Sequence, residues 1–450
     1  MNLKTRRVLF FASLAIFLIA SPAVIMYSLG YKFDTETFTM QKTGGIFVNA
    51  DYGEYTISIN DSIKKDVQKA IFIKRGILFT NLIPKVYKVS IEKNNYLSWS
   101  KTLPVESGLV TEVKNVFLMP KDPEILEVDK DVSDFTISGS QEKIAYLKKS
   151  EIIIMDVKSG EKISMPSKSK KTLNLTGFSS DEKDIFFEDD SNIYKTSFAD
   201  NTVKSMAEPK NDPYAKIAQS LKDKDTAYAL SKKGVIYELN IATKTRKEIT
   251  KDIKNFYLTG NDIVYITTEP QNFYKINIDS GKTTQITFNP LSNIDQNSKI
   301  IKRFDDPVAV IDKNSDLLIF SYGSEKFNKL ADNIIDAQVS SDLSKMFYRK
   351  DKEIYVYYFT ESYPAKKAGD TDLIGIFGKK IKDASWFSFN NHHLFLNFDN
   401  DIKIIELDGR DKRNSYTIAE NIEKFEYNNK DKFAYIIKNN DLKKIRLMEE

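Results

Sequence analysis

The chain has 450 residues, 41% of them hydrophobic and 12% aromatic, which is enough apolar surface for two or three folded domains and excludes a disordered chain. Its 67 Lys and Arg residues nearly balance 63 Asp and Glu residues, and a formal charge of +4 excludes a strong basic field for nucleic acid. Cysteine is absent, which excludes disulfides, cysteine-ligated zinc and thiol nucleophiles.

An uncharged segment near the start is long enough to cross a membrane. No Asp, Glu, Lys or Arg occurs between Val8 and Tyr31, and about 22 residues of this kind span a hydrocarbon core of roughly 30 Å. Charged residues flank the segment on both sides: Lys4, Arg6 and Arg7 precede it, and Lys32, Asp34 and Glu36 follow it. The positive-inside rule therefore predicts a single-pass protein of the cell membrane, with a cytoplasmic N-terminus and an extracytoplasmic bulk.

A cleaved signal peptide is the alternative, because a basic start and the apolar stretch from Leu9 to Ala20 also suit export. We favour a permanent anchor, since the apolar run continues through Met26 and the patch from Ala20 to Ala23 makes a poor cleavage site. We expect residues 1–31 to form the cytoplasmic start and the transmembrane helix, and residues 32–43 to form a linker.

Residues 44–120 predict a small β domain. Apolar residues alternate with polar ones in two clusters, which is the period of half-buried strands: Ile46 and Val48, then Tyr55, Ile57 and Ile59, and later Tyr87, Val89 and Ile91. A last strand is expected between Leu109 and Leu118.

This domain resembles the PEGA domain, a small extracytoplasmic β-sandwich. The resemblance rests on three stretches: Gly45-Ile46-Phe47-Val48, the turn at Gly53, and Leu82-Ile83-Pro84-Lys85-Val86-Tyr87-Lys88-Val89 followed by Tyr96. The family's tetrapeptide is replaced by Asp51-Tyr52-Gly53-Glu54 and its Pro-Gly turn by Pro84-Lys85. Another small immunoglobulin-like sandwich is the alternative, and it would change the expected function little.

Residues 121–450 contain a repeated unit of about four strands with a spacing of roughly 40 residues, which is typical of a β-propeller. Eight copies of its second strand occur: Ile144-Ala145-Tyr146, Ile185-Phe186-Phe187, Ala227-Tyr228-Ala229, Ile263-Val264-Tyr265, Val308-Ala309-Val310, Met346-Phe347-Tyr348, Leu394-Phe395-Leu396 and Phe433-Ala434-Tyr435. We therefore expect an all-β protein whose propeller has eight blades, or alternatively seven. Because the last unit ends at Leu447 after a third strand, the segment from Glu124 to Val128 is expected to supply its fourth.

The turns between these strands carry their own signal. Phe178-Ser179-Ser180-Asp181-Glu182-Lys183 and Val339-Ser340-Ser341-Asp342-Leu343-Ser344-Lys345 resemble the Phe-Ser-Pro-Asp-Gly-Lys turn of TolB-type, WD40-like propellers, although both lack its Pro and Gly. Other turns are rich in Asp and Asn, namely Asp189-Asp190-Ser191-Asn192, Asn400-Asp401 and Asn439-Asn440-Asp441. We interpret these as turn formers that hydrogen-bond their own backbone rather than as metal ligands.

The chain offers few residues for catalysis. Its two histidines, His392 and His393, are adjacent and expected in a solvated turn, where they cannot chelate one metal. No catalytic triad, zinc-protease helix, calcium loop or phosphate-binding glycine loop occurs. We expect no enzyme activity, no cofactor and no metal. Tyr355, Tyr357, Tyr358, Trp386 and Phe387 could anchor a partner, but core packing is the favoured interpretation.

A polar residue recurs where the first strand of a blade begins, near one rim of the expected central channel. These residues are Asp134, Asn255, Asp336, Asp383 and Glu423. They predict a ligand-binding rim, while the alternative is that each side chain hydrogen-bonds an inter-blade loop. The expected function is a cell-envelope protein that binds a protein, peptide or glycan through the propeller. The alternatives are a propeller hydrolase with two rim carboxylates as acid and base, and a purely structural envelope protein without a ligand.

Overall fold

The computed structural model describes residues 3–50, 52–67, 76–149, 151–167, 173–189, 192–207, 209–321, 323–399 and 401–448. The chain divides into two compact units. Unit 1 comprises Met1–Pro123 together with Ile405–Tyr416, and unit 2 comprises Glu124–Ile404 together with Thr417–Glu450. The assignment of 405–416 to unit 1 was not anticipated from the sequence.

Unit 1 begins with helix α1 (Leu3–Ser28), in which Thr5–Ser28 is long enough and apolar enough to cross a membrane. None of its apolar stretch is buried against the rest of the protein. The segment 32–43, predicted as a linker, contains a hairpin of β1 (Tyr31–Asp34) and β2 (Thr39–Lys42). Asp34 stabilises its turn, since its carboxylate accepts hydrogen bonds from the Thr37 hydroxyl at 2.7 Å and from Gln41 Nε2 at 3.1 Å.

Two further sheets form the rest of unit 1. In the three-stranded sheet, β3 (Gly44–Ala50) lies between β6 (Ile77–Leu82) and β9 (Val110–Val116), antiparallel to the first and parallel to the second. Gly45 allows this close approach, because a Cβ there would lie 2.9 Å from the Phe79 carbonyl oxygen. The four-stranded sheet has the order β5 (Ile63–Val67), β4 (Tyr55–Ile59), β7 (Val86–Glu92) and β8 (Trp99–Pro104).

The alternation predicted for residues 44–120 is confirmed in these strands. Ile46, Val48, Ile57, Val89 and Ile91 are all fully buried. In the tetrapeptide that replaces the PEGA motif, Asp51 lies outside the described residues, whereas Tyr52 is buried and its hydroxyl donates to the Leu118 carbonyl at 3.2 Å.

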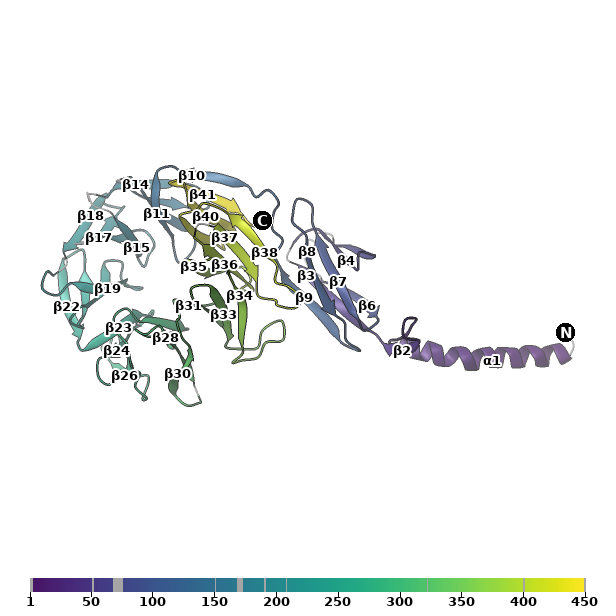
Figure 1. Cartoon of the computed structure of the whole chain (residues 1–450). Coiled ribbons are helices and arrows are strands. Elements are labelled where there is room, and N and C mark those ends of the chain that lie inside the picture. Colours follow the sequence, from purple (N-terminus) through teal and green to yellow (C-terminus); the bar gives the residue numbers. More distant parts are fainter. Residues whose placement is uncertain are drawn as a thin grey trace. The chain divides into compact units, whose positions relative to one another are not determined.

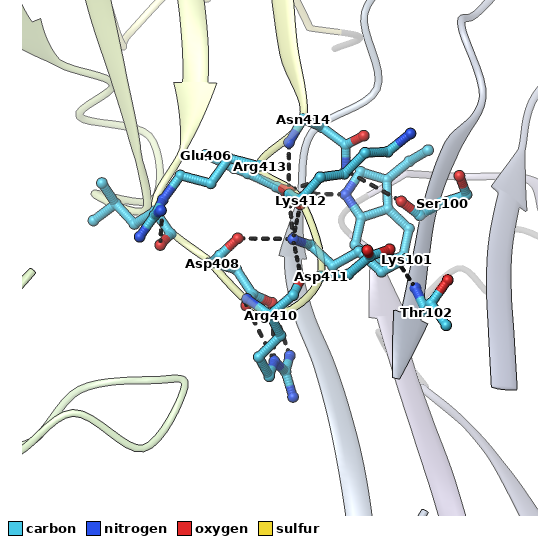
Figure 2. Close-up of polar contacts among 12 residues, drawn as sticks. Ser100, Lys101, Thr102, Glu406, Asp408, Arg410, Asp411, Lys412, Arg413 and Asn414 are labelled. Carbon is cyan, nitrogen blue, oxygen red and sulfur yellow. Dashed lines mark hydrogen bonds and ion pairs between the residues drawn. The ribbon is translucent and has the colours of Figure 1, made fainter. Parts of the chain in front are cut away.

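The segment Ile405–Tyr416 packs around a single lysine of β8 in unit 1 (Figure 2). The Lys101 ammonium donates to the carbonyl oxygens of Asp408 at 2.7 Å, Arg410 at 3.0 Å and Lys412 at 2.7 Å. It also pairs with the Glu406 carboxylate at 2.7 Å, and both side chains are buried. The chain thus wraps a loop around one buried cation whose donors are satisfied inside the protein.

Unit 2 consists, in its described part, of eight four-stranded antiparallel sheets (Figure 1). The first four are sheet 1 with β11 (Val132–Ile137), β12 (Lys143–Lys148), β13 (Glu151–Asp156) and β14 (Lys162–Pro166); sheet 2 with β15 (Asn174–Phe178), β16 (Ile185–Glu188), β17 (Asn192–Ser197) and β18 (Thr202–Ala207); sheet 3 with β19 (Tyr214–Gln219), β20 (Thr226–Ser231), β21 (Ile236–Asn240) and β22 (Thr245–Thr250); and sheet 4 with β23 (Ile253–Leu258), β24 (Asp262–Thr267), β25 (Phe273–Asn277) and β26 (Thr283–Gln285).

The remaining four sheets follow the same order, with one exception at the end. They are sheet 5 with β27 (Lys299–Arg303), β28 (Asp306–Ile311), β29 (Leu317–Ser321) and β30 (Lys326–Ala331); sheet 6 with β31 (Asp336–Val339), β32 (Lys345–Arg349), β33 (Glu353–Tyr358) and β34 (Thr371–Ile376); sheet 7 with β35 (Asp383–Trp386), β36 (His393–Phe398), β37 (Asp401–Glu406) and β38 (Ser415–Ala419); and sheet 8 with β39 (Lys424–Asn428), β40 (Phe433–Lys438), β41 (Asp441–Arg446) and β10 (Ile125–Asp129).

All eight predicted second strands are second strands in the structure. The predicted pairing at the end of the chain is also confirmed, because β10 runs antiparallel to β41 and completes sheet 8. Each sheet packs on the next through apolar side chains, and sheet 8 packs on sheet 1 through a cluster that includes Tyr146 of β12 and Tyr435 of β40. The sheets therefore close into a ring in which each sheet packs its faces against its two neighbours. This is the architecture of a β-propeller.

The turns behave as predicted where the structure describes them. The Asp189 carboxylate accepts from the backbone amide of Asn192 at 3.0 Å, and Asn439 and Asn440 both have positive φ angles. Asp190, Ser191 and Asn400 lie outside the described residues. Glu182 and Leu343 take positive φ at the position of the missing glycine in the two Ser-Ser-Asp turns.

Candidate binding site in the ring of inner strands

In five sheets a buried aliphatic residue lies at the start of the first strand or two residues before it. Two residues after this aliphatic residue comes the polar side chain of interest; the pairs are Val132 and Asp134, Ile253 and Asn255, Ile334 and Asp336, Ile381 and Asp383, and Ile422 and Lys424. Four predicted residues therefore share this position. The fifth, Glu423, lies one residue too early, and its carboxylate accepts from the backbone amide of Asn440 at 3.2 Å. Because side chains alternate along a strand, the one-residue offset places Lys424 rather than Glu423 at the shared position.

Lysines on neighbouring inner strands pair with three of the predicted residues. Lys424 donates to the Asp134 carboxylate at 2.7 Å, and Lys216 donates to Asn255 Oδ1 at 2.9 Å. Lys299 forms an ion pair with Asp336. In each case the lysine lies on the first strand of the preceding sheet, so these bonds join adjacent sheets around the ring.

Asn255 fits the alternative prediction from the sequence, that the polar side chain hydrogen-bonds an inter-blade loop. It is fully buried, and its amide nitrogen donates to the carbonyl oxygens of Asp295 at 3.2 Å, Gln296 at 3.3 Å and Ser298 at 2.5 Å. These carbonyls belong to the chain that enters sheet 5. Asn255 is therefore committed to holding an inter-sheet loop, and burial lowers the pKa of its partner Lys216 to about 8.

Asp336 and Asp383 line one cavity of about 330 Å³ between the first strands of sheets 6, 7 and 8. A second cavity of about 230 Å³ is lined by Asp383, Glu423 and Lys424. Burial raises the pKa of Asp383, and the nearby charge of Asp336 raises it further. The structure thus brings Asp383 together with Asp336 on one side and with Glu423 on the other, while Asp134 and Asn255 line neither cavity.

Glu426 lines both cavities and was missed from the sequence. Its carboxylate accepts from the backbone amide of Ile137 at 3.2 Å and lies 3.6 Å from Lys424. Burial raises its pKa, against the opposing effect of Lys424.

One of the two histidines departs from the expectation of a solvated turn, whereas His392 lies in a bend and is partly exposed. His393 begins β36, is buried, and its Nδ1 lies 3.3 Å from the Asn390 side-chain oxygen. Three of the five aromatic residues fit the predicted core role, since Tyr358, Trp386 and Phe387 are buried, whereas Tyr355 and Tyr357 are half-buried. Trp386 also lines the larger cavity, so a core side chain forms part of the wall of that cavity.

No family model matches the sequence, and no curated protein matches it. Among solved structures, the chain is similar to the C-terminal WD40 domain of Sif2 at 13% identity and a TM-score of 0.49, covering 72% of this chain and 99% of that one. It is also similar to the β-propeller domain of Cps50 (Swd1) from Myceliophteria thermophila, at 9% identity, a TM-score of 0.42 and coverage of 73% and 100%. A third, the dihydro-heme d1 dehydrogenase NirN in complex with DHE, has 11% identity, a TM-score of 0.46 and coverage of 74% and 71%.

Similarity at this level carries no argument about function, and the propeller architecture rests on the sheet order and packing described above. The residues that sequence reasoning missed are the lysines Lys216, Lys299 and Lys424 together with Glu426 and Asn397. A search restricted to acidic and amide side chains at the strand start could not find them. A buried residue two positions earlier, Ile422 before Lys424 and Tyr214 before Lys216, is the signal that could have aligned these lysines with Asp134.

Proposed function

We propose that the chain is a single-pass protein of the cell membrane whose C-terminal eight-bladed β-propeller binds an envelope protein, peptide or glycan on the extracytoplasmic side, without catalysing a reaction. One observation carries the proposal. The apolar helix α1 is not buried against the rest of the protein, and it belongs to a chain that otherwise folds into β-sheets with a charged cavity between their first strands. Within this proposal, residues 44–120 are a PEGA-like β-sandwich that acts as a spacer, and residues 121–450 are the propeller.

The basic residues before α1 support a cytoplasmic N-terminus. Arg6 and Arg7 precede the uncharged stretch, and an excess of Lys and Arg on one flank keeps that flank in the cytoplasm. With one crossing, the residues that follow α1 lie on the opposite side.

The absence of cysteine permits a direct test of this topology, because every introduced thiol is unique. Ser324→Cys places a thiol on an exposed turn of sheet 5, and Thr5→Cys places one at the start of α1. In intact cells, a membrane-impermeant maleimide should label the Ser324→Cys chain, and should label the Thr5→Cys chain only after lysis. The reverse pattern would contradict the proposed orientation.

The binding role is tested by capturing partners with the detergent-solubilised full chain from envelope extract. A variant that combines Asp336→Asn with Asp383→Asn removes two carboxylates from the larger cavity. Capture of a partner by the wild-type chain, with clear loss by the variant and an unchanged melting temperature, supports binding through the larger cavity. Equal capture by both would reject this cavity as the binding surface.

A propeller hydrolase is the second candidate, favoured by the fact that Asp336 and Asp383 line one cavity and that the Asp383 pKa is raised by burial. A raised pKa suits a general acid, and a glycosidase uses two carboxylates. Its test is release of reducing ends from envelope glycan, with loss of this activity in Asp383→Asn. The ion pair between Lys299 and Asp336 holds the second carboxylate in a structural contact, which favours the binding role.

A further inference from the structure

The larger cavity, between the first strands of sheets 6, 7 and 8, and the smaller cavity, between sheets 7 and 8, share one wall. Asp383, Ala384, Ser385, Phe425 and Glu426 line both of them. The smaller cavity, of about 230 Å³, lies below the roughly 300–1,000 Å³ of pockets for drug-sized ligands. Its size suits one side-chain-sized group rather than a whole small molecule.

Two of the three lysines that line the two cavities, Lys299 and Lys424, have ion-pair partners. Lys424 points to sheet 1, where it donates to the Asp134 carboxylate at 2.7 Å and to the Phe135 carbonyl at 2.5 Å. Lys299 pairs with Asp336. Among the described residues, the only hydrogen bond to the Asp383 carboxylate comes from the backbone amide of Ala384 at 2.8 Å, and no Lys or Arg forms an ion pair with it. Asp383 is therefore the carboxylate of the shared wall that no described Lys or Arg pairs with, whereas Glu426 lies 3.6 Å from Lys424 and the exposed Lys382 also lines the smaller cavity.

An independent observation points to a ligand that donates hydrogen bonds. Asn397 of β36 lines the smaller cavity and is only 8% exposed. Its Oδ1 is buried and accepts no hydrogen bond from any residue that the structure describes. A buried acceptor without a donor costs free energy, so a donor supplied from outside the chain would relieve that cost.

Aromatic rings complete the wall. Phe395 and Phe425 line the smaller cavity with their ring centroids 4.8 Å apart, and Phe425 is partly exposed. A planar cation stacks on such a face more favourably than a compact ammonium does. A guanidinium also presents five N–H donors in one plane, which matches a carboxylate and an amide oxygen together.

We propose that this cavity binds a guanidinium group, held by the Asp383 carboxylate and Asn397 Oδ1, against Phe425 and near Glu426. The ligand is the guanidinium of an arginine side chain of a bound protein or peptide. The inference rests on the proposed binding function of the propeller, and it names the chemical class of group that the smaller cavity takes.

The test uses the full chain in detergent, titrated by calorimetry with agmatine as the guanidinium probe and cadaverine as a diamine of similar length. Agmatine should bind saturably, at least tenfold more tightly than cadaverine. Asp383→Asn and Asn397→Leu should each weaken agmatine at least tenfold. Glu361→Gln, which removes one exposed carboxylate outside both cavities, is the matched control and should bind like the wild type.

Fluorescence offers a second readout, because Trp386 lines the adjoining cavity and the chain has only one other tryptophan, Trp99. A Trp99→Phe chain should change its emission on agmatine addition, and the Asp383→Asn form of that chain should not. No saturable binding of agmatine at millimolar concentrations, or equal affinity for cadaverine, overturns the inference. A third outcome separates the two proposals. If agmatine does not bind, but the wild-type chain captures a partner that the Asp336→Asn and Asp383→Asn double variant does not, the guanidinium site is wrong and the binding function stands.

Discussion

At the scale of single residues, one structural position is filled in different ways around the ring. Lys424 with Asp134 and Lys299 with Asp336 are ionic pairs between neighbouring sheets, whereas Lys216 meets the neutral Asn255. The neighbouring backbone explains why a neutral amide stands at position 255. The Asn255 amide nitrogen donates to three backbone carbonyls that a carboxylate would repel. The lowered pKa of Lys216 is the consequence of burial without a counter-charge.

Asn255→Asp should therefore have opposite effects on two measurable quantities. It supplies a counter-charge, so the pKa of Lys216 should rise above its value of about 8. It also removes the donor shared by Asp295, Gln296 and Ser298, so the free energy of unfolding should fall by about 1–3 kcal/mol. NMR titration of the lysine side-chain signals and urea unfolding measure the two effects. A variant more stable than the wild type would refute this account of Asn255.

At the scale of elements, β10 closes the ring, and one carboxylate ties its end to sheet 1. Asp129 accepts hydrogen bonds from Lys148 at 2.6 Å, the Tyr146 hydroxyl at 2.7 Å and Lys162 at 3.0 Å. Burial alone would raise the pKa of Asp129, but these hydrogen bonds outweigh it and hold the pKa well below its usual value. A lowered folded pKa means that the carboxylate stabilises the folded state above its unfolded pKa of about 4. That contribution is lost as pH falls through the folded value.

Asp129→Asn should lower the free energy of unfolding at neutral pH by about 1–3 kcal/mol. The difference from the wild type should shrink as pH falls below about 4, because Asp129 in the unfolded wild-type chain then binds a proton while the folded carboxylate stays ionised. Asp131→Asn is the matched control, since the pair between Asp131 and Lys149 is exposed and contributes little. Urea unfolding across pH measures both variants. A pH-independent difference would show that the charge of Asp129 is not what ties β10 to sheet 1.

The loop from Ile405 to Tyr416 is the second element held by one residue. Lys101→Met leaves the Glu406 carboxylate buried and three loop carbonyls without their donor, which should cost unit 1 about 3–5 kcal/mol. Combining it with Glu406→Gln should recover part of the loss, because the uncompensated charge is gone. Lys412→Met is the control, since that side chain is exposed. Hydrogen exchange in β8 and residues 405–416 reports the effect; unchanged protection in Lys101→Met would contradict it.

At the scale of the whole molecule, the sequence predicts repetition well and single positions poorly. The second strands were found because Ile-x-Tyr patterns and polar turns recur, and a buried strand needs them wherever it lies. Glu423 was misplaced because a one-residue offset is invisible without the strand register that identifies Lys424. The Lys101 contact was invisible for another reason: its partners are backbone carbonyls far along the chain, and any residue supplies a carbonyl.

Orientation in the membrane is the property on which the proposed function of the whole chain depends. If Arg6 and Arg7 keep the N-terminus in the cytoplasm, then Arg6→Glu with Arg7→Glu removes most of the charge bias across α1. In intact cells, impermeant-maleimide labelling of the Ser324→Cys chain should then fall severalfold, because a large fraction of chains inserts the other way or fails to insert. Arg6→Lys with Arg7→Lys keeps the charge and should label like the parent chain. Undiminished labelling of the glutamate variant would mean that a feature other than the flanking charge orients the helix.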